Sequence, residues 1–345
     1  MKLYFLFVKA SPPWEAVLRR PVLRRLVVDV SSAVGMLLSD PVFYPTGKKL
    51  LAKGHQLNDE DILLLTREGY AQVPVNVLED DDVPEEEAAV QLALQTACGS
   101  LEIRIGAGGR ANLVATESCC LLVDEGRLRE LNSSGIVTAA TLPNLSFAFA
   151  EQRLVTIKSA PFGVPRQGLE RERARLQAAG PLLEARPVGE PAVGVLYSDP
   201  FEAERARRLF EGIMRTRLER FGVHASFVLA AREEEESLAR SLQHLLRARP
   251  TMVLMASTTA PAGPDDVVGR AIKRVGGSLE RFMAPVEPGN LLLLAYVGEV
   301  PVVAAPGCFR SARPNVLDLL LPAFLTQYRI NAAEIGGFGH GGLLQ

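Results

Sequence analysis

Hydroxyl and carboxyl side chains gather in one stretch of the chain, between residues 251 and 310, directly after short apolar runs of strand length. The first run covers residues 252–256, and a helical pattern opens at residue 267. The polar residues between them are Ser257, Thr258, Thr259, Asp265 and Asp266. A loop between a strand and a helix offers free backbone N–H groups and a positive partial charge to anions. We therefore expect this loop to bind a phosphate or a similar anion.

The two aspartates of this loop allow more than one role. At the start of a helix an acidic side chain caps free N–H groups and interacts favourably with the helix dipole. A carboxylate beside a phosphate-binding loop can also hold a divalent cation through its oxygens. The sequence leaves both roles open for Asp265 and Asp266.

Three other loops have a similar setting, next to apolar runs that end or begin at a turn. Their turn residues are Ser198 and Asp199 after residues 193–197, Pro288 and Gly289 before residues 291–296, and Pro306 and Gly307 after residues 300–305. We expect these loops and the hydroxyl-rich loop to form one binding site.

The elements around these loops alternate between strand and helix patterns over residues 191–330. This order predicts a doubly wound, mostly parallel sheet with right-handed crossovers, in an α/β domain. Ligands of such sheets bind in a crevice at the carboxyl ends of the strands. The predicted topology therefore places the loops where a ligand would bind.

The rest of the chain is predicted to form four further segments. An N-terminal α/β segment covers residues 1–100, a small β-rich module residues 101–165, a helical connector residues 166–190, and a Gly-rich tail without regular structure residues 331–345. The apolar run at residues 3–8 is interpreted as the first strand and not as a secretory signal, because no small-residue cleavage site follows it.

Composition narrows the class of protein. The 345 residues are 48% hydrophobic and 23% charged, with a net charge of −2. These values are typical of globular domains and give no reason to expect nucleic acid or an anionic membrane as a partner. No apolar run approaches the roughly 20 residues that span a bilayer. The spacing of the four cysteines favours a reducing, cytoplasmic environment.

Other reactive residues have weaker support. Cys308 follows a strand and could face the crevice, but no histidine is placed to activate it, so a bystander role is favoured. His340 lies among glycines and is read as part of a flexible tail, with a tail folded over a site as the alternative. The glutamate run that begins at Glu233 is interpreted as a solvated helix face. The sequence has neither a P-loop nor a dinucleotide-binding glycine motif.

With these residues described, the chain resembles the molybdopterin-binding family of molybdenum-cofactor biosynthesis. The resemblance extends over nearly the whole chain and is closest in APVEPGNLLLLAYVGEVPVVAAPGC and in the tail GGFGHGGLL. It implies binding of molybdopterin or its adenylylated form, with insertion of molybdate assisted by Mg²⁺. It also implies a homodimer and, as a further partner, a molybdoenzyme. In this view Asp265 or Asp266 is the catalytic residue that holds the cation or positions molybdate, and the hydroxyls of the loop bind the terminal phosphate.

Two of the family's binding loops are altered in this chain. A T-G-S-E turn is replaced by residues 198–201, reading SDPF, and a T-G-G-x-S loop by residues 257–261, reading STTAP. The lost glycines would let a backbone approach a phosphate closely. The sequence therefore leaves three functions open: a molybdenumtransferase, a non-catalytic carrier or sensor of the cofactor, and a binder of an unrelated nucleotide.

Overall fold

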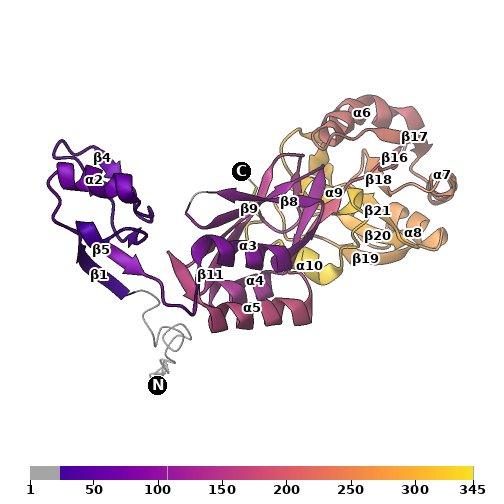
Figure 1. The fold of residues 1–345 in the computed structure, drawn as a ribbon. Coiled ribbons are helices and arrows are strands. Elements are labelled where there is room, and N and C mark those ends of the chain that lie inside the picture. Colours follow the sequence, from indigo (N-terminus) through magenta and orange to yellow (C-terminus); the bar gives the residue numbers. More distant parts are fainter. Residues whose placement is uncertain (1–23, 107, 345) are drawn as a thin grey trace, which may run out of the picture. The chain divides into compact units, whose positions relative to one another are not determined.

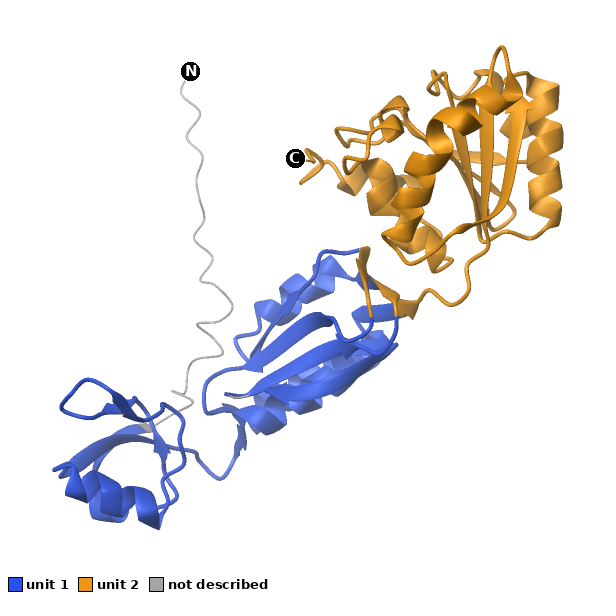
Figure 2. Cartoon of the chain, turned by 90° about the horizontal axis from the view of Figure 1, so that it is seen from above, with its two compact units in different colours: residues 1–117, 121–144, 150–185 blue, residues 118–120, 145–149, 186–345 orange. Residues whose placement is uncertain are grey.

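The computed structural model describes residues 24–344 apart from residue 107, so the strand predicted at residues 3–8 lies outside the described residues. The chain divides into two compact units, coloured separately in Figure 2. Unit 1 comprises residues 1–117, 121–144 and 150–185, and unit 2 comprises residues 118–120, 145–149 and 186–345. We describe each unit by itself.

The first part of unit 1 is a small sheet with one covering helix. Strands β1 (Arg24–Asp29), β5 (Gln72–Val77) and β2 (Leu37–Leu38) pair antiparallel in the order β1-β5-β2, and β3 (Val42–Phe43) pairs with β4 (Lys49–Leu51). Helix α2 (Asp59–Arg67) has Asn58 as its N-cap, and Asn58 forms a capping box with Asp61. Leu38, Leu65 and Val75 lie in the core of this part and are fully buried.

The second part of unit 1 is an antiparallel sheet in the order β11-β13-β9-β8, packed against helix α3 (Glu85–Thr96). Its strands are β8 (Leu101–Gly106), β9 (Arg110–Ala115), β11 (Val137–Thr141) and β13 (Arg153–Ser159). Helix α5 (Arg166–Ala179) contacts α3, and helix α4 (Glu125–Asn132) contacts β11. The short strands of unit 1 are β6 (Asp82–Pro84), β7 (Ala97–Gly99) and β14 (Gly163–Pro165), with most of β10 (Cys119–Val123) and of β15 (Leu183–Pro187), whereas β12 (Ser146–Ala148) belongs to unit 2.

Two of these elements differ from the sequence prediction. Helix α4 lies where only short strands and turns were expected, and strand β15, which pairs in parallel with β7, lies within the stretch predicted as a helical connector. The side chain of Asp124 accepts a hydrogen bond from the Arg127 N–H, which stabilises the start of α4.

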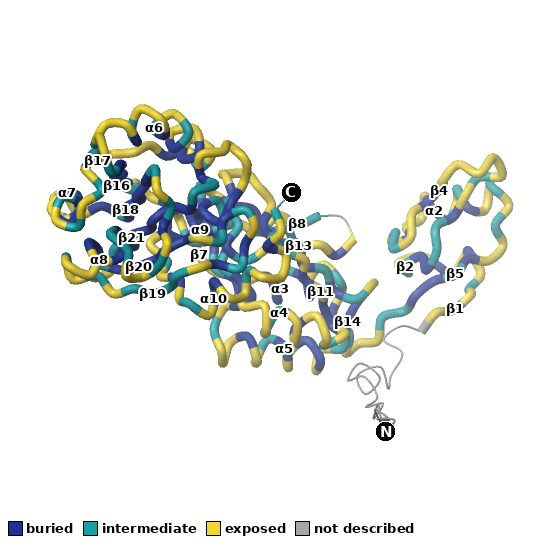
Figure 3. The backbone as a smooth tube through the Cα atoms, turned by 180° about the vertical axis from the view of Figure 1, so that it is seen from behind, coloured by how far each residue is buried: buried dark blue, intermediate teal, exposed yellow. Residues whose placement is uncertain are grey.

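Unit 2 contains a mixed sheet, six-stranded among the described residues, in the order β17-β16-β18-β21-β20-β19. Its strands are β16 (Val193–Asp199), β17 (Ala225–Arg232), β18 (Met252–Ser257), β19 (Ser278–Phe282), β20 (Leu293–Val297) and β21 (Val300–Ala304). The first four strands of this order are parallel to one another. Strand β20 pairs antiparallel with β21, and β19 pairs antiparallel with β20. The prediction of a mostly parallel sheet is therefore confirmed, with a hairpin edge in addition. The backbone trace in Figure 3 shows β16, β18 and β21 as buried.

Helices cover the sheet of unit 2. Helices α7 (Glu235–Arg247) and α8 (Val267–Arg274) pack on each other. Both contribute to one apolar core together with Leu196, Val253 and Met255 of the strands. Helix α6 (Ala203–Glu219) packs against β16, β17 and β18 and contributes no residue to that core, so it covers the other face (Figure 1). Helix α9 (Val316–Leu325) and the 3-10 helix η2 (Gly307–Arg310) follow β21.

The hairpin edge explains how a loop that precedes its strand reaches the carboxyl edge. Leu293, the first residue of β20, pairs with Ala304 at the end of β21, and also with Phe282 at the end of β19. The loop between β19 and β20, which contains Pro288 and Gly289, therefore lies at the same edge as the carboxyl ends of the parallel strands.

The C-terminal tail was predicted to lack regular structure, but it begins with the short helix α10 (Ala332–Gly337). Asn331 caps this helix and forms a capping box with Glu334. Within the part of the chain that the structure describes, no helix has both the length and the apolar character needed to cross a bilayer.

Candidate functional site

The loops after β16, β18 and β21 contact one another at the carboxyl edge of the unit 2 sheet. The N–H of Thr258 donates to the carbonyl oxygen of Ser198 at 3.1 Å, and the Thr258 hydroxyl donates to Asp199 Oδ2 at 2.7 Å. A Cβ added at Gly307 would lie 3.3 Å from the Cβ of Ala260. The sequence-predicted residues Ser198, Asp199, Thr258 and Gly307 are therefore brought together, as a shared binding edge requires.

Asp199 is fully buried at the end of β16 and is held by four donors. Its Oδ1 accepts the N–H groups of Phe201 (2.8 Å) and Glu202 (2.9 Å), while Oδ2 accepts Thr258 Oγ1 and lies 3.2 Å from Arg205 Nη1. Burial alone raises the pKa of Asp199, but the hydrogen bonds and the guanidinium outweigh it and lower the pKa to about 2. Asp199 is consequently ionised at neutral pH.

Glu233, which sequence analysis did not single out, is a second carboxylate at this edge. It directly follows β17, is half-buried, and accepts hydrogen bonds from the hydroxyls of both Ser257 and Thr259. Burial raises the pKa of Glu233, and the charges of Asp266 and Asp199 raise it further, against the lowering effect of the two hydroxyl bonds. The signal that could have found Glu233 is its position, one residue beyond a strand of the same parallel sheet.

The hydroxyls of the loop after β18 therefore already have acceptors within the protein. Ser257 and Thr259 donate to Glu233, and Thr258 donates to Asp199. Sequence analysis expected these hydroxyls to donate to a phosphate. The structure places two carboxylates at the positions where the hydroxyls point, and like charge disfavours an anion there.

Two guanidinium groups stand beside these carboxylates. The side chain of Arg205, half exposed, reaches Asp199, and the exposed Arg310 donates through Nη2 to the carbonyl oxygen of Thr258. The Arg310 guanidinium also lies 5.5 Å from the centre of the Phe210 ring. Each guanidinium has five N–H donors, so both retain donors for an anionic group.

The two predicted metal-binding aspartates have separate partners. Asp266 caps α8, since Oδ1 accepts the Gly269 N–H at 2.7 Å and Oδ2 accepts the Ala262 N–H at 2.8 Å. Asp265 is exposed, and its Oδ1 lies 2.5 Å from Lys273 Nζ, which lowers the pKa of the carboxyl. Among the described residues, no group of three or more His, Cys, Asp or Glu side chains is arranged to hold a metal ion. Of the two roles left open by the sequence, helix capping is the one that the structure shows for Asp266.

The loop that contains Pro288 and Gly289 packs on helix α9. Gly289 has φ +136°, and a Cβ added there would lie 2.8 Å from the backbone nitrogen of Val316. Only glycine fits this approach without strain. The C-terminal tail pairs with the same loop. The Glu287 N–H donates to the carbonyl oxygen of Gly342 at 2.7 Å, and the Leu344 N–H donates to the carbonyl oxygen of Glu287 at 2.8 Å.

The surroundings of Cys308 and His340 do not favour a catalytic role. Burial raises the pKa of the Cys308 thiol, and the nearby Glu287 carboxylate raises it further. A raised pKa disfavours the thiolate that acts as a nucleophile, which agrees with the bystander role. His340 is exposed in the tail beyond α10. Pro306, which was predicted as a binding residue, is the N-cap of η2.

A buried ion pair fixes the elements behind these loops. Arg217 of α6 is 2% exposed and forms an ion pair with Asp318 of α9, while its Nη2 donates to the carbonyl oxygen of Ser311 at 3.0 Å. Asp318 Oδ2 also accepts the N–H of Asn315, the N-cap of α9. The pair thus joins α6 to the segment that follows η2.

The chain has only low similarity to known proteins. No family model matches the chain, and no curated protein matches it. Among solved structures, a molybdenum cofactor biosynthesis protein from Pyrococcus furiosus is 12% identical with a TM-score of 0.25, over 88% of this chain and 64% of that one. The chain thus spans less than two thirds of the length of that protein.

Two solved structures of the molybdopterin biosynthesis moeA protein from Pyrococcus horikoshii also align. One is 13% identical with a TM-score of 0.32, over 92% of this chain and 76% of that one. The other is 12% identical with a TM-score of 0.26, over 88% and 74%. Similarity of this size establishes neither a common fold nor a common ligand.

Proposed function

We propose that unit 2 binds molybdopterin, or its adenylylated form, as a non-catalytic carrier or sensor in molybdenum-cofactor biosynthesis. The single observation that carries the non-catalytic part is the engagement of Ser257, Thr258 and Thr259 by Asp199 and Glu233. The class of ligand is supported by the resemblance of residues 284–308 and of the tail to the molybdopterin-binding family.

In this proposal the anionic end of the ligand is bound by guanidinium groups and not by the loop hydroxyls. Arg205 contacts Asp199, Arg310 contacts the carbonyl oxygen of Thr258, and both retain N–H donors. Arginine presents a planar fork that suits phosphate oxygens, and charge-assisted bonds of this kind are the strong ones. The Asp199 carboxylate positions Arg205, and the Thr258 carbonyl oxygen and the Phe210 ring position Arg310.

The planar part of the ligand has an aromatic side chain available. Phe201 follows Asp199 by two residues, is 78% exposed, and its backbone N–H is fixed by the Asp199 carboxylate. Exposure of a large aromatic ring costs free energy that stacking on a flat heterocycle would recover. Phe201 is therefore the stacking residue in this proposal.

Insertion of molybdate is the second candidate, and it rests on Asp265 and Asp266. For either aspartate to hold Mg²⁺, Asp266 must leave the α8 cap or Asp265 must leave Lys273. Because both carboxylates have partners in the folded chain, the carrier or sensor role needs fewer rearrangements. The transferase role makes the opposite prediction for magnesium and for the two aspartates.

Calorimetric titration of the full chain with molybdopterin and its adenylylated form, with and without Mg²⁺, tests the proposal. We expect binding that is independent of Mg²⁺ and of Asp265→Ala, and that weakens about tenfold or more in Arg310→Ala, because a charged hydrogen bond is lost. The control is Arg313→Ala, which removes an exposed arginine three residues further along.

Each other outcome has a defined meaning. Binding that requires Mg²⁺ and is lost in Asp265→Ala or Asp266→Ala would replace the carrier with the molybdenumtransferase, and turnover with molybdate would then be measured. Absence of binding to either pterin would overturn the proposal. A thermal shift with nucleotides but not with pterin would establish the third alternative, a nucleotide binder.

A further inference from the structure

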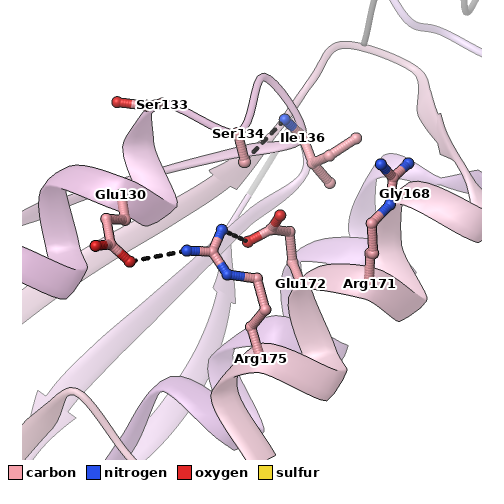
Figure 4. Close-up of a pocket in the computed structure, with 8 residues that line it drawn as sticks. All are labelled: Glu130, Ser133, Ser134, Ile136, Gly168, Arg171, Glu172 and Arg175. Carbon is pink, nitrogen blue, oxygen red and sulfur yellow. Dashed lines mark hydrogen bonds and ion pairs between the residues drawn. The ribbon is translucent and has the colours of Figure 1, made fainter. Parts of the chain in front are cut away.

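A pocket of about 300 Å³ lies in unit 1, between helices α4 and α5. Figure 4 shows its lining, which includes Glu130, Ser134, Ile136, Gly168, Arg171 and Glu172. Gly168 makes the close approach to the facing segment, because a Cβ there would lie 2.6 Å from Ile136 Cδ1. The pocket is in unit 1, so it is separate from the pterin site proposed in unit 2.

Two helices form the sides of the pocket. The last residue of α4 is Asn132, and Ser133 and Ser134, which follow it directly, form one side. The other side is one face of α5, along which Gly168, Arg171, Glu172 and Arg175 recur at helical spacing.

Charged side chains line the pocket. The side chain of Glu172 is 11% exposed, and only one of its oxygens has a partner, Arg175 Nη1 at 3.3 Å. The other oxygen has no hydrogen bond among the described residues and points into the pocket (Figure 4). Glu130 stands on the same side and is bound by Arg175 Nη2 at 2.8 Å.

Arg171 and Ser134 supply the unused donors. Arg171 makes no hydrogen bond or ion pair with any residue that the structure describes, although it lines the pocket one residue before Glu172. Ser134 Oγ accepts the Ile136 N–H at 3.2 Å, which leaves its O–H free to donate. The lining therefore has one unused acceptor oxygen, in Glu172, and two unused donors, in Arg171 and Ser134, among the bonds that the described residues make.

We propose that this pocket binds a small zwitterion, namely a free α-amino acid. Its ammonium group meets the free oxygen of Glu172. Its carboxylate meets the guanidinium of Arg171. Ile136 gives the lining an apolar surface for a short side chain. A ligand with a single charge would face one like charge, that of Arg171 or of Glu172, so the pocket discriminates against both simple anions and simple cations.

Calorimetric titration of the full chain with L-alanine and L-serine tests the assignment. The comparison ligands are N-acetyl-alanine, which lacks the ammonium charge, and alanine amide, which lacks the carboxylate. We expect both to bind at least about tenfold more weakly than L-alanine, because each leaves one charged contact unmade. Arg171→Gln should weaken L-alanine binding by a similar factor, and Ser134→Ala by less.

The matched control is Arg166→Gln, which changes the first residue of the same helix, an exposed arginine outside the pocket lining. Thermal unfolding of each variant checks that the fold is kept. If neither amino acid gives saturable binding, the proposal is wrong. Binding of either comparison ligand as tight as that of L-alanine, or an Arg171→Gln variant that binds L-alanine like Arg166→Gln, would also overturn it. Each outcome is independent of pterin binding in unit 2.

Discussion

Charged side chains have different surroundings at the carboxyl edge of the unit 2 sheet and in the α4–α5 pocket of unit 1. At the carboxyl edge Asp199 is fully buried and accepts four donors from its own chain. In the pocket Arg171 has no partner among the described residues, and Glu172 uses one oxygen. In the first region the carboxylates and loop hydroxyls are satisfied within the protein and only the guanidiniums of Arg205 and Arg310 retain donors, whereas in the second region both a carboxylate and a guanidinium retain bonding capacity.

The contrast teaches that position at a strand end is not sufficient for anion binding. A loop rich in hydroxyls binds a phosphate only if its donors are unoccupied, and here the carboxylates of Asp199 and Glu233 occupy them. A charge that is buried and paired stabilises local structure, while a charge at a pocket wall is available for recognition. Three measurements would sharpen or break this comparison.

The largest effect is expected for the buried pair of unit 2. Arg217→Leu should lower the free energy of unfolding by about 3 kcal/mol or more, because it leaves the Asp318 carboxylate without its buried cation. Urea denaturation measures this change. The control is Arg215→Leu on the same helix, whose side chain is 68% exposed and lies 3.9 Å from Glu219. Equal destabilisation by both variants would contradict a special role for the buried pair.

A smaller effect, dependent on pH, is expected for Glu233. Its pKa is raised in the folded chain, so the unfolded chain ionises first as pH rises, and the free energy of unfolding falls until the folded pKa is passed. The effect of Asp199 on the free energy of unfolding has the opposite sign. Because its pKa is lowered in the folded chain, the free energy of unfolding rises with pH between about 2 and about 4. Urea denaturation over a pH series should show that Glu233→Gln removes the decline but keeps the rise. A decline that persists in Glu233→Gln would assign it to another group.

The smallest effect is expected for the exposed bridge of unit 1. Arg175 and Glu130 are 52% and 63% exposed, so Glu130→Ala, which leaves Arg175 paired with Glu172, should lower the free energy of unfolding by less than about 1 kcal/mol, and less again at high salt. The measurement is urea denaturation at low and high ionic strength. A loss as large as that of Arg217→Leu would show that the α4–α5 region depends on its ion pairs as strongly as unit 2 does.

Long elements with clear periodicity could be predicted from the sequence. Strand β16 was predicted at residues 193–197 and extends to Asp199, β18 was predicted at residues 252–256 and extends to Ser257, and α8 begins at residue 267 as predicted. Helix α4 was missed because its eight residues are mostly polar and contain Gly126, so its helical state depends on capping by Asp124 and on packing against β11. Tertiary contacts of this kind leave no periodic signal.

The position of the candidate site at the sheet edge could be predicted from the sequence, but the hydrogen bonds between its side chains could not. The edge topology brought the loops of Ser198, Thr258 and Gly307 together as expected. Glu233 was missed because a run of glutamates is typical of a solvated helix, and only the structure shows that its first member turns towards Ser257 and Thr259. A sequence pattern places a residue on an element but does not specify its hydrogen bond partner.

The bonding of Glu233 has a consequence for how this loop can evolve. A substitution of Glu233 alone leaves the hydroxyls of Ser257 and Thr259 without their acceptor, and loss of the hydroxyls alone leaves a half-buried carboxylate without its donors. Each single step is costly, whereas the combined change is not. Positions 233, 257 and 259 should therefore vary together among homologues, as one inherited block.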